Sequence, residues 1–239
     1  MTLLRLMNHT TSQGWQKIRP FLWRFFSFLL TLLLLLSSCG SEQSDTIAIA
    51  TARGLSPGTE VVVRGFVTVP SGLFASFTGE QGFAIEDSTG GIYVSLESAM
   101  NLPLGKEVRA SGPLADIAKL IVVSSRQPAI EQLSRQVVVQ PSDITTGAVS
   151  AATEGLLVRI HGTMTRPVGD DRPYGYKIFL DDGSGETQVF VPVSTGIDPL
   201  ALPGLQTGQH FTVVGFSGRF NDTYEVIPRF SEDLIVASP

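Results

Sequence analysis

Beyond residue 50, the apolar residues of this chain come in short β-branched runs that Gly, Pro, Asp and Ser interrupt. Short runs bounded by turn-forming residues are typical of β-strands. No long amphipathic helical stripe breaks the series. The clearest runs are residues 61–63, 121–123, 137–139 and 213–214. The pattern therefore predicts an all-β protein after the first fifty residues.

The strand pattern occurs twice, because four blocks of sequence return in the same order. The repeat aligns Gly65 with Gly162 and Asp87 with Asp182. The blocks lie slightly farther apart in the second copy, as insertions in loops would allow. The blocks pair residues 61–70 with 157–167, 83–94 with 178–191, 104–112 with 207–215, and 128–133 with 228–234. Internal similarity of this kind indicates two copies of one structural unit.

The two copies are expected over residues 51–140 and 141–239. Each copy is predicted to contain five strands. The first strand runs to a glycine, where a small residue permits a sharp bend. Strands two and three form a hairpin around Asp-Ser-Thr-Gly-Gly or Asp-Gly-Ser-Gly. A Leu- and Pro-containing connector precedes strand four (98–105 and 197–208). This order is the signature of the OB fold, so we expect two tandem five-stranded OB-fold-like barrels.

The first forty residues follow a different pattern. Residues 1–24 are polar and basic, and residues 25–36 are almost purely apolar. This apolar run is shorter than the roughly 20 residues that a membrane-spanning helix needs. A basic flank, a short apolar run and small residues after it predict a secretion signal.

The string Leu36-Ser37-Ser38-Cys39 resembles the lipobox of bacterial lipoproteins. The resemblance implies that a diacylglycerol alkylates the Cys39 thiol and that the leader, 1–38, is cut off. Cys39 is the only cysteine in the chain, so a disulfide within the chain is excluded. Residues 39–50 would then tether the first barrel to the membrane lipid. The protein would lie in the cell envelope, on the periplasmic side or at the outer membrane.

The blocks GFVTVPSGLF, GFAIEDSTGGIYV and IFLDDGSGETQVFV resemble the tandem OB-fold modules of secreted bacterial proteins. The resemblance covers nearly all of the chain after Cys39. It implies an OB fold, and relatives of those modules are described as nucleic-acid-binding. Because OB folds serve many partners, the resemblance specifies fold better than function.

The residues that could carry catalysis are few. After Cys39 the chain has two histidines, His161 and His210, both expected in strands next to shared glycines. The sequence shows no nucleophile elbow and no phosphate-binding glycine loop. The acidic turn 181–186 could supply oxygen ligands to a hard cation, but a tight hairpin is the plainer interpretation. We expect no enzyme, no cofactor and no metal.

OB folds bind ligands along strands two and three, between the loop after strand one and the loop between strands four and five. Single strands are held there by aromatic stacking and by basic groups on phosphates. The first unit has Phe74 and Phe77 in its first loop but no nearby Lys or Arg, and both rings could simply cap the barrel end. The second unit supplies the expected ligand-binding residues Arg166, Arg172, Tyr174, Tyr176, Lys177, Phe190, Arg219 and Tyr224.

Net charge weighs against a polyanionic ligand. The leader carries four basic residues and no acidic one, so the chain from Cys39 onward holds 13 basic and 22 acidic residues, a net charge of −9. Polyanion-binding domains usually have a basic surface. The basic loop could equally be an ordinary solvated loop. Two partners therefore remain open: a single-stranded nucleic acid or oligosaccharide on the second unit, or a protein of an envelope complex.

Overall fold

The computed structural model describes residues 45–236, and these belong to one compact unit. The expected signal peptide and the lipid-bearing Cys39 lie outside the described residues. Within 45–236, no helix has the length and apolar character needed to cross a membrane. The described part of the expected tether packs onto the fold, because Ile47 bridges Val63 and Ile49 is buried.

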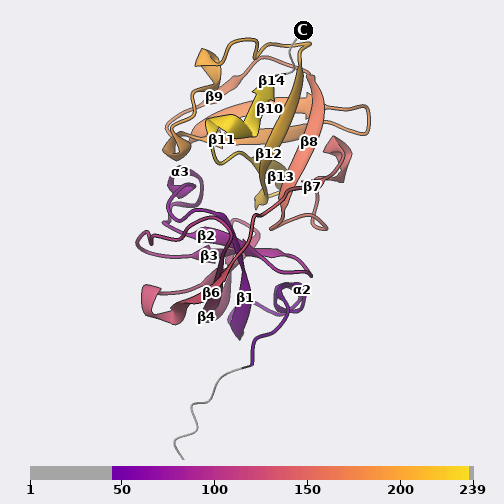
Figure 1. Ribbon diagram of the computed structural model, residues 1–239. Coiled ribbons are helices and arrows are strands. Elements are labelled where there is room, and N and C mark those ends of the chain that lie inside the picture. The colour runs from indigo at the N-terminus through magenta and orange to yellow at the C-terminus, as the bar shows by residue number, and fades with distance from the viewer. Residues whose placement is uncertain (1–44, 237–239) are drawn as a thin grey trace, which may run out of the picture. The chain divides into compact units, whose positions relative to one another are not determined.

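The first barrel closes in the strand order β1-β2-β3-β5-β4, with β4 returning to β1 (Figure 1). Only the β3–β5 pair is parallel. This is the OB topology. Strand β6 extends the sheet from β4. The elements are α2 (Ile49–Arg53), β1 (Glu60–Val69), α3 (Ala75–Thr78), β2 (Phe83–Glu86), β3 (Gly91–Ser95), β4 (Lys106–Ile117), β5 (Leu120–Ser124), η2 (Gln127–Ala129) and β6 (Ile130–Gln136).

The second barrel repeats this order as β8-β10-β11-β13-β12, again closed by the first and fourth strands. The expected fold class, two tandem five-stranded OB-fold barrels, is confirmed. Strands β7, β9 and β14 are additions at its edges. The elements are β7 (Ser142–Asp143), η3 (Thr146–Ala148), β8 (Leu157–Met164), β9 (Gly169–Asp171), β10 (Gly175–Asp181), β11 (Thr187–Pro192), η4 (Val193–Thr195), η5 (Pro199–Ala201), β12 (His210–Phe220), β13 (Thr223–Ile227), η6 (Ser231–Asp233) and β14 (Leu234–Val236).

The repeated residues have matching structural roles. A Cβ atom at Gly65 would lie 2.6 Å from the carbonyl oxygen of Glu86, and one at Gly162 would meet the backbone of Asp181 at 3.1 Å. Each glycine therefore lets the first strand cross closely over the end of the second. Asp87 accepts the Ile49 amide, and Asp182 accepts the Thr146 amide, so each aspartate ties its hairpin to the short helix before strand one.

Each barrel has its own apolar core. Inward positions alternate along every strand, as in Val61, Val63 and Val67 of β1. The residues at 137–139, an apolar run in the sequence, follow the end of β6 and form no strand; Val138 is 83% exposed.

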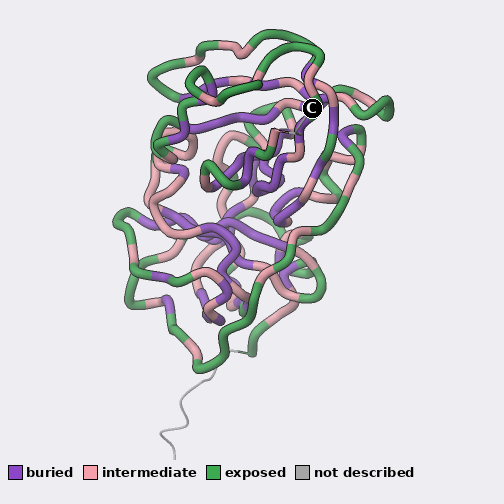
Figure 2. Tube along the Cα trace, turned by 45° about the horizontal axis from the view of Figure 1, so that its top comes forward, coloured by how far each residue is buried: buried purple, intermediate pink, exposed green. Residues whose placement is uncertain are grey.

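A third apolar cluster joins the two barrels. In Figure 2, buried positions of the chain lie where the barrels meet. Outward side chains of the first barrel, including Tyr93 and Val122, pack with Phe216 and Ile227 of the second barrel. The Phe216 ring lies 6.0 Å from both Phe74 and Tyr93. Two barrels that share a buried cluster of this kind are held together by the same burial that stabilises each core.

Buried polar contacts accompany this cluster. Arg229 is buried, forms an ion pair with Asp233 and donates from Nη1 to the Thr68 carbonyl oxygen of the first barrel at 2.9 Å. Arg53 pairs with Glu154 at 2.7 Å. A Cβ atom at Gly155, whose φ is +94°, would lie 2.1 Å from the Gly91 carbonyl oxygen. The barrels thus meet backbone to backbone.

Candidate functional site

In the first barrel, the face where an OB fold binds its ligand is covered. Its outward residues on β2, β3 and β5 are Ala84, Tyr93 and Val122, which lie in one row across the sheet. All three are buried, and they contact the second barrel through Phe216 and Ile227. The apolar character of this row explains its burial, because water contact with it would be unfavourable.

In the second barrel, two of the three equivalent positions are polar. Strand register places Phe179 opposite Gln188 and Gln188 beside Glu225, the positions that Ala84, Tyr93 and Val122 hold in the first barrel. The next row pairs Lys177 with Phe190. This face is the candidate site, because it combines rings, an amide and a carboxylate on the binding strands of an OB fold.

The basic residues expected at this site are all matched by neighbouring carboxylates. Arg166 pairs with Glu186, and its guanidinium carbon lies 3.9 Å from the Phe179 ring centroid.

Arg172 clamps Asp170 with Nε–Oδ1 at 2.9 Å and Nη2–Oδ2 at 2.6 Å, and its hydrogen bonds hold the pKa of the Asp170 carboxyl at about 2. Lys177 lies 2.9 Å from Asp171.

Arg219 points to its own loop. It donates from Nε to the Asn221 carbonyl oxygen at 2.8 Å, reaches Asp222 at 3.9 Å and lies over the Tyr224 ring at 4.8 Å. Residues 45–236 hold 13 of the chain's 17 Lys and Arg, and 11 of these 13 form an ion pair. The described surface therefore offers little unbalanced positive charge to a phosphate backbone.

The expected aromatic residues divide between surface and interior. Tyr174 is 61% exposed, whereas Tyr176 is 7% exposed and belongs to the core. Phe190 faces outward but is only 5% exposed. Period-two alternation with Ile178 and Leu180 could have placed Tyr176 inside, since all three share one face of β10.

Phe190 is covered by the first barrel. The Phe77 ring, on α3, lies 5.6 Å from the Phe190 ring and 6.0 Å from the Phe220 ring. Ser76 donates to the Tyr174 carbonyl oxygen at 2.9 Å, and its hydroxyl lies 3.0 Å from that of Ser194. The loop after strand one of the first barrel thus lies on the candidate face of the second.

Glu225 is the least expected member of the site. It is 1% exposed. The Gln188 side chain donates to its Oε2, while its Oε1 has no hydrogen-bond partner. Burial raises the pKa of the Glu225 carboxyl to about 7, although the Gln188 hydrogen bond and the Lys177 charge oppose the shift. A lone carboxylate in the apolar strand TYEVI was the sequence signal for it, and the contact with Gln188 and the burial come from tertiary packing.

The remaining candidate groups have ordinary partners. His161 and His210 are exposed and contact the Thr212 and Thr163 hydroxyls at 2.8 and 3.2 Å. In the turn 181–186, Asp181 accepts the backbone amides of Gly183 and Gly185. Across the described range, no three His, Cys, Asp or Glu side chains are arranged to hold a metal ion.

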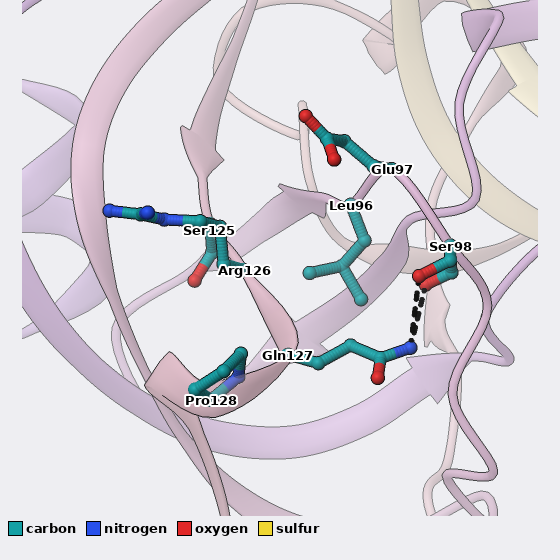
Figure 3. A pocket seen from close by; sticks show the side chains of 7 residues that line it. All are labelled: Leu96, Glu97, Ser98, Ser125, Arg126, Gln127 and Pro128. Atoms are coloured by element: carbon teal, nitrogen blue, oxygen red, sulfur yellow. Dashed lines mark hydrogen bonds between the residues drawn. The ribbon is translucent and has the colours of Figure 1, made fainter.

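A shallow hollow of about 280 Å³ lies on the first barrel, between the end of β3 and the connection from β5 to β6 (Figure 3). Gln127 crosses it and donates to the Ser98 hydroxyl at 3.1 Å and the Ala99 carbonyl oxygen at 3.1 Å. Arg126 and Glu97 line its rim. The charged ends of Arg126 and Glu97 point away from each other (Figure 3), so we place the candidate site on the second barrel.

No protein-family model matches the chain, and no curated protein matches it either. Solved structures resemble it at low identity. The OB domain of MM0293 from Methanosarcina mazei is 16% identical, with 42% of this chain and 88% of that one covered and a TM-score of 0.33. The strand topology itself establishes the OB fold of both barrels.

Two further structures contain nucleic acid. A replication protein A heterotrimer bound to ssDNA is 12% identical, with 78% of this chain and 51% of that one covered and a TM-score of 0.34. A murine DNA-binding protein bound with ds DNA is also 12% identical, with 75% and 97% covered and a TM-score of 0.36. These similarities concern architecture alone.

Proposed function

We propose that this chain is a non-catalytic lipoprotein of the cell envelope that binds a neutral oligosaccharide on the β10–β11–β13 face of its second barrel. The observation that carries the proposal is that Arg166, Arg172 and Lys177, the basic residues on that face, each pair with a carboxylate. A face whose charges are internally balanced, with exposed rings beside amide and carboxylate oxygens, fits a polar uncharged ligand.

Nucleic acid is the less favoured ligand for the same reason. Affinity for a phosphate backbone comes largely from cations that replace condensed counterions. Arg172 and Lys177 would first have to leave Asp170 and Asp171. The net charge of the described residues, 13 basic against 21 acidic, would also repel a polyanion at long range.

Sugar rings need a different set of groups, which this face provides. Their C–H faces pack on aromatic rings, and their hydroxyls donate to carboxylates and accept from amides. Tyr174 and Phe220 supply exposed rings, and Gln188 supplies an amide. OB folds use this face for oligosaccharides as well as for oligonucleotides.

The membrane part of the proposal rests on the lipobox-like string before Cys39. Changing Cys39→Ser should abolish labelling by a radioactive fatty acid and leave the leader attached. Leu104→Ser, far along the chain, is a matched control that should label like the wild type. Undiminished label on the Cys39→Ser protein would overturn the anchor.

The ligand is tested with the full-length protein in detergent on an immobilised panel of neutral oligosaccharides, with oligothymidylate as the nucleic-acid arm. We expect binding to neutral glycans that added salt leaves unchanged. Tyr174→Ala should weaken it. Tyr224→Ala serves as the aromatic control, because Tyr224 precedes Glu225 on β13 and its side chain therefore points to the opposite face of the strand. Binding to oligothymidylate alone, weakening as salt rises, would replace the saccharide with nucleic acid.

A protein partner is the second candidate function, and one observation favours it. Strand β6 is an edge strand with β4 on one side only, and the chain continues from it into the exposed Val137 and Val138. Unpaired edges next to apolar side chains accept strands of other proteins. Val138→Lys should abolish cross-linking to an envelope partner through this edge while leaving glycan binding intact.

A further inference from the structure

The Phe77 ring lies against the outward face of the second barrel, beside the buried carboxylate of Glu225. The sheet order β12-β13-β11 puts β13 between the strands that carry Phe220 and Phe190. Glu225 of β13 pairs with Gly218 and Gln188, each two residues before one of those rings. Because the Phe77 ring contacts both Phe190 and Phe220, it crosses β13 beside Glu225.

Glu225 is incompletely satisfied where it lies. Its Oε2 receives the Gln188 side chain, and its buried Oε1 has no partner. A buried polar atom without a hydrogen bond is rare in native proteins and calls for a specific explanation. The explanation we draw is that Oε1 accepts a hydrogen bond from a ligand that enters when the face is uncovered.

The cover itself is held by replaceable contacts. Helix α3 is a four-residue turn without a side-chain cap. The Ser76 amide donates to the Ser194 hydroxyl at 3.1 Å, and the Ser194 amide donates to the Ser76 hydroxyl at 3.2 Å, both in exposed positions. Water can replace each of these bonds. Phe74, just before α3, is buried in the cluster between the barrels, so the opening is confined to residues 75–79 and leaves both cores intact.

We propose that residues 75–79, here called the strap, cover a saccharide subsite in which a sugar ring takes the place of Phe77. The ring packs its C–H face against Phe190 and Phe220, and one of its hydroxyls donates to Oε1 of Glu225. This inference rests on the proposed function and adds to it the subsite, its acceptor and the device that controls access.

The chemistry of the subsite selects a neutral ring. A hydroxyl proton completes the Glu225 carboxylate, whereas a phosphate oxygen there would face the Glu225 and Asp171 carboxylates. The apolar side of the site is already shaped for a flat ring, because Phe77 occupies it in the closed state. Binding affinity is reduced by the fraction of molecules in which the strap is open.

A reversible lock tests the strap. The Ser76 and Ser194 hydroxyl oxygens lie 3.0 Å apart, so cysteines at both positions bring their sulfurs within reach of a disulfide. The full-length protein carries Cys39→Ser to remove the third thiol, and the probe is the neutral glycan that binds best on the panel. We expect the oxidised Ser76→Cys/Ser194→Cys protein to lose binding and dithiothreitol to restore it.

Two substitutions test the subsite. Phe77→Ala should empty the subsite and tighten glycan binding by about tenfold, because no ring then competes with the sugar in the closed state. Phe66→Ala removes an equal ring from the β1 side of the first barrel and should leave affinity unchanged. Glu225→Ala should abolish binding, while hydrogen exchange of residues 75–79 stays as in the wild type.

The outcomes separate the two proposals. If glycans bind but neither the lock nor Phe77→Ala changes their affinity, the strap is wrong and the proposed function stands. If no glycan binds the wild type, Phe77→Ala or the reduced double cysteine, the saccharide function and the subsite both fail. If Phe77→Ala instead gains oligothymidylate binding that weakens with salt, the face is a nucleic-acid site and the subsite chemistry is overturned.

Discussion

The two barrels share one fold, but the same row of outward positions has opposite character in each. In the first barrel the row is Ala84, Tyr93 and Val122, and in the second it is Phe179, Gln188 and Glu225. The apolar row is buried by the other barrel. On the second barrel, Arg166 lies over Phe179, and the Phe77 ring contacts Phe190 and Phe220 on either side of β13.

This difference shows how two copies of one fold can have outward surfaces of different character. An outward apolar row is stabilised only when another surface covers it, so the first barrel uses its binding face for docking. Permanent apolar cover does not stabilise a row that holds a carboxylate, because burying a charge without a partner costs free energy. The second barrel therefore keeps polar side chains at these outward positions.

The largest expected effect on stability comes from shortening a side chain in the apolar row of the first barrel. Tyr93→Ala should lower the free energy of unfolding by about 3–5 kcal/mol, as for other large-to-small changes at buried aromatic residues. Gln188→Ala, at the equivalent position of the second barrel, should cost less than about 1.5 kcal/mol. Urea titration of both variants measures the difference. Equal losses would mean that the two rows do not differ in role.

The next effect concerns the buried arginine between the barrels. Arg229→Ala leaves Asp233 buried without its partner and the Thr68 carbonyl oxygen without a donor. Removing one member of a buried ion pair costs about 3 kcal/mol or more. Arg159→Ala, which breaks the exposed pair with Asp143, is the matched control and should change little. Calorimetry that shows equal shifts in Tm would contradict the interface assignment.

A smaller effect is expected from pH. Burial raises the pKa of Glu225, and likewise of Glu86, to about 7, above the ordinary value of 4.5. Between these values the folded protein keeps protons that the unfolded chain releases, so both groups make stability fall as pH rises from about 4.5 to 7. Glu225→Gln should remove its share, about 1–3 kcal/mol, and raise stability at pH 8. An unchanged pH profile would show that Glu225 is not buried in solution.

The smallest effect is expected at the exposed ion pairs of the second barrel. Arg172→Ala should leave Tm unchanged within error, because the pair with Asp170 is exposed and screened. It should also leave the salt dependence of glycan binding flat. A salt slope of oligothymidylate binding that is present in the wild type and lost in Arg172→Ala would mean that Arg172 binds phosphate, as the sequence indicated.

The sequence by itself determined the architecture. The repeated glycines and aspartates predict the two closed barrels, because Gly65 and Gly162 permit the close strand crossing and Asp87 and Asp182 bond local amides. Such features act over short distances or through backbone geometry. Strand alternation could also have placed Tyr176 in the core.

Tertiary structure alone decided which outward residues are available. Alternation tells which side chains share a face, but it does not tell what covers that face. Phe77 and Phe190 are more than a hundred residues apart, yet their rings meet on the second barrel. The sequence pattern predicts Arg172 as a phosphate contact, whereas in the structure its guanidinium donates to Asp170. Long-range packing and ion pairing depend on three-dimensional distance, which a linear pattern does not contain.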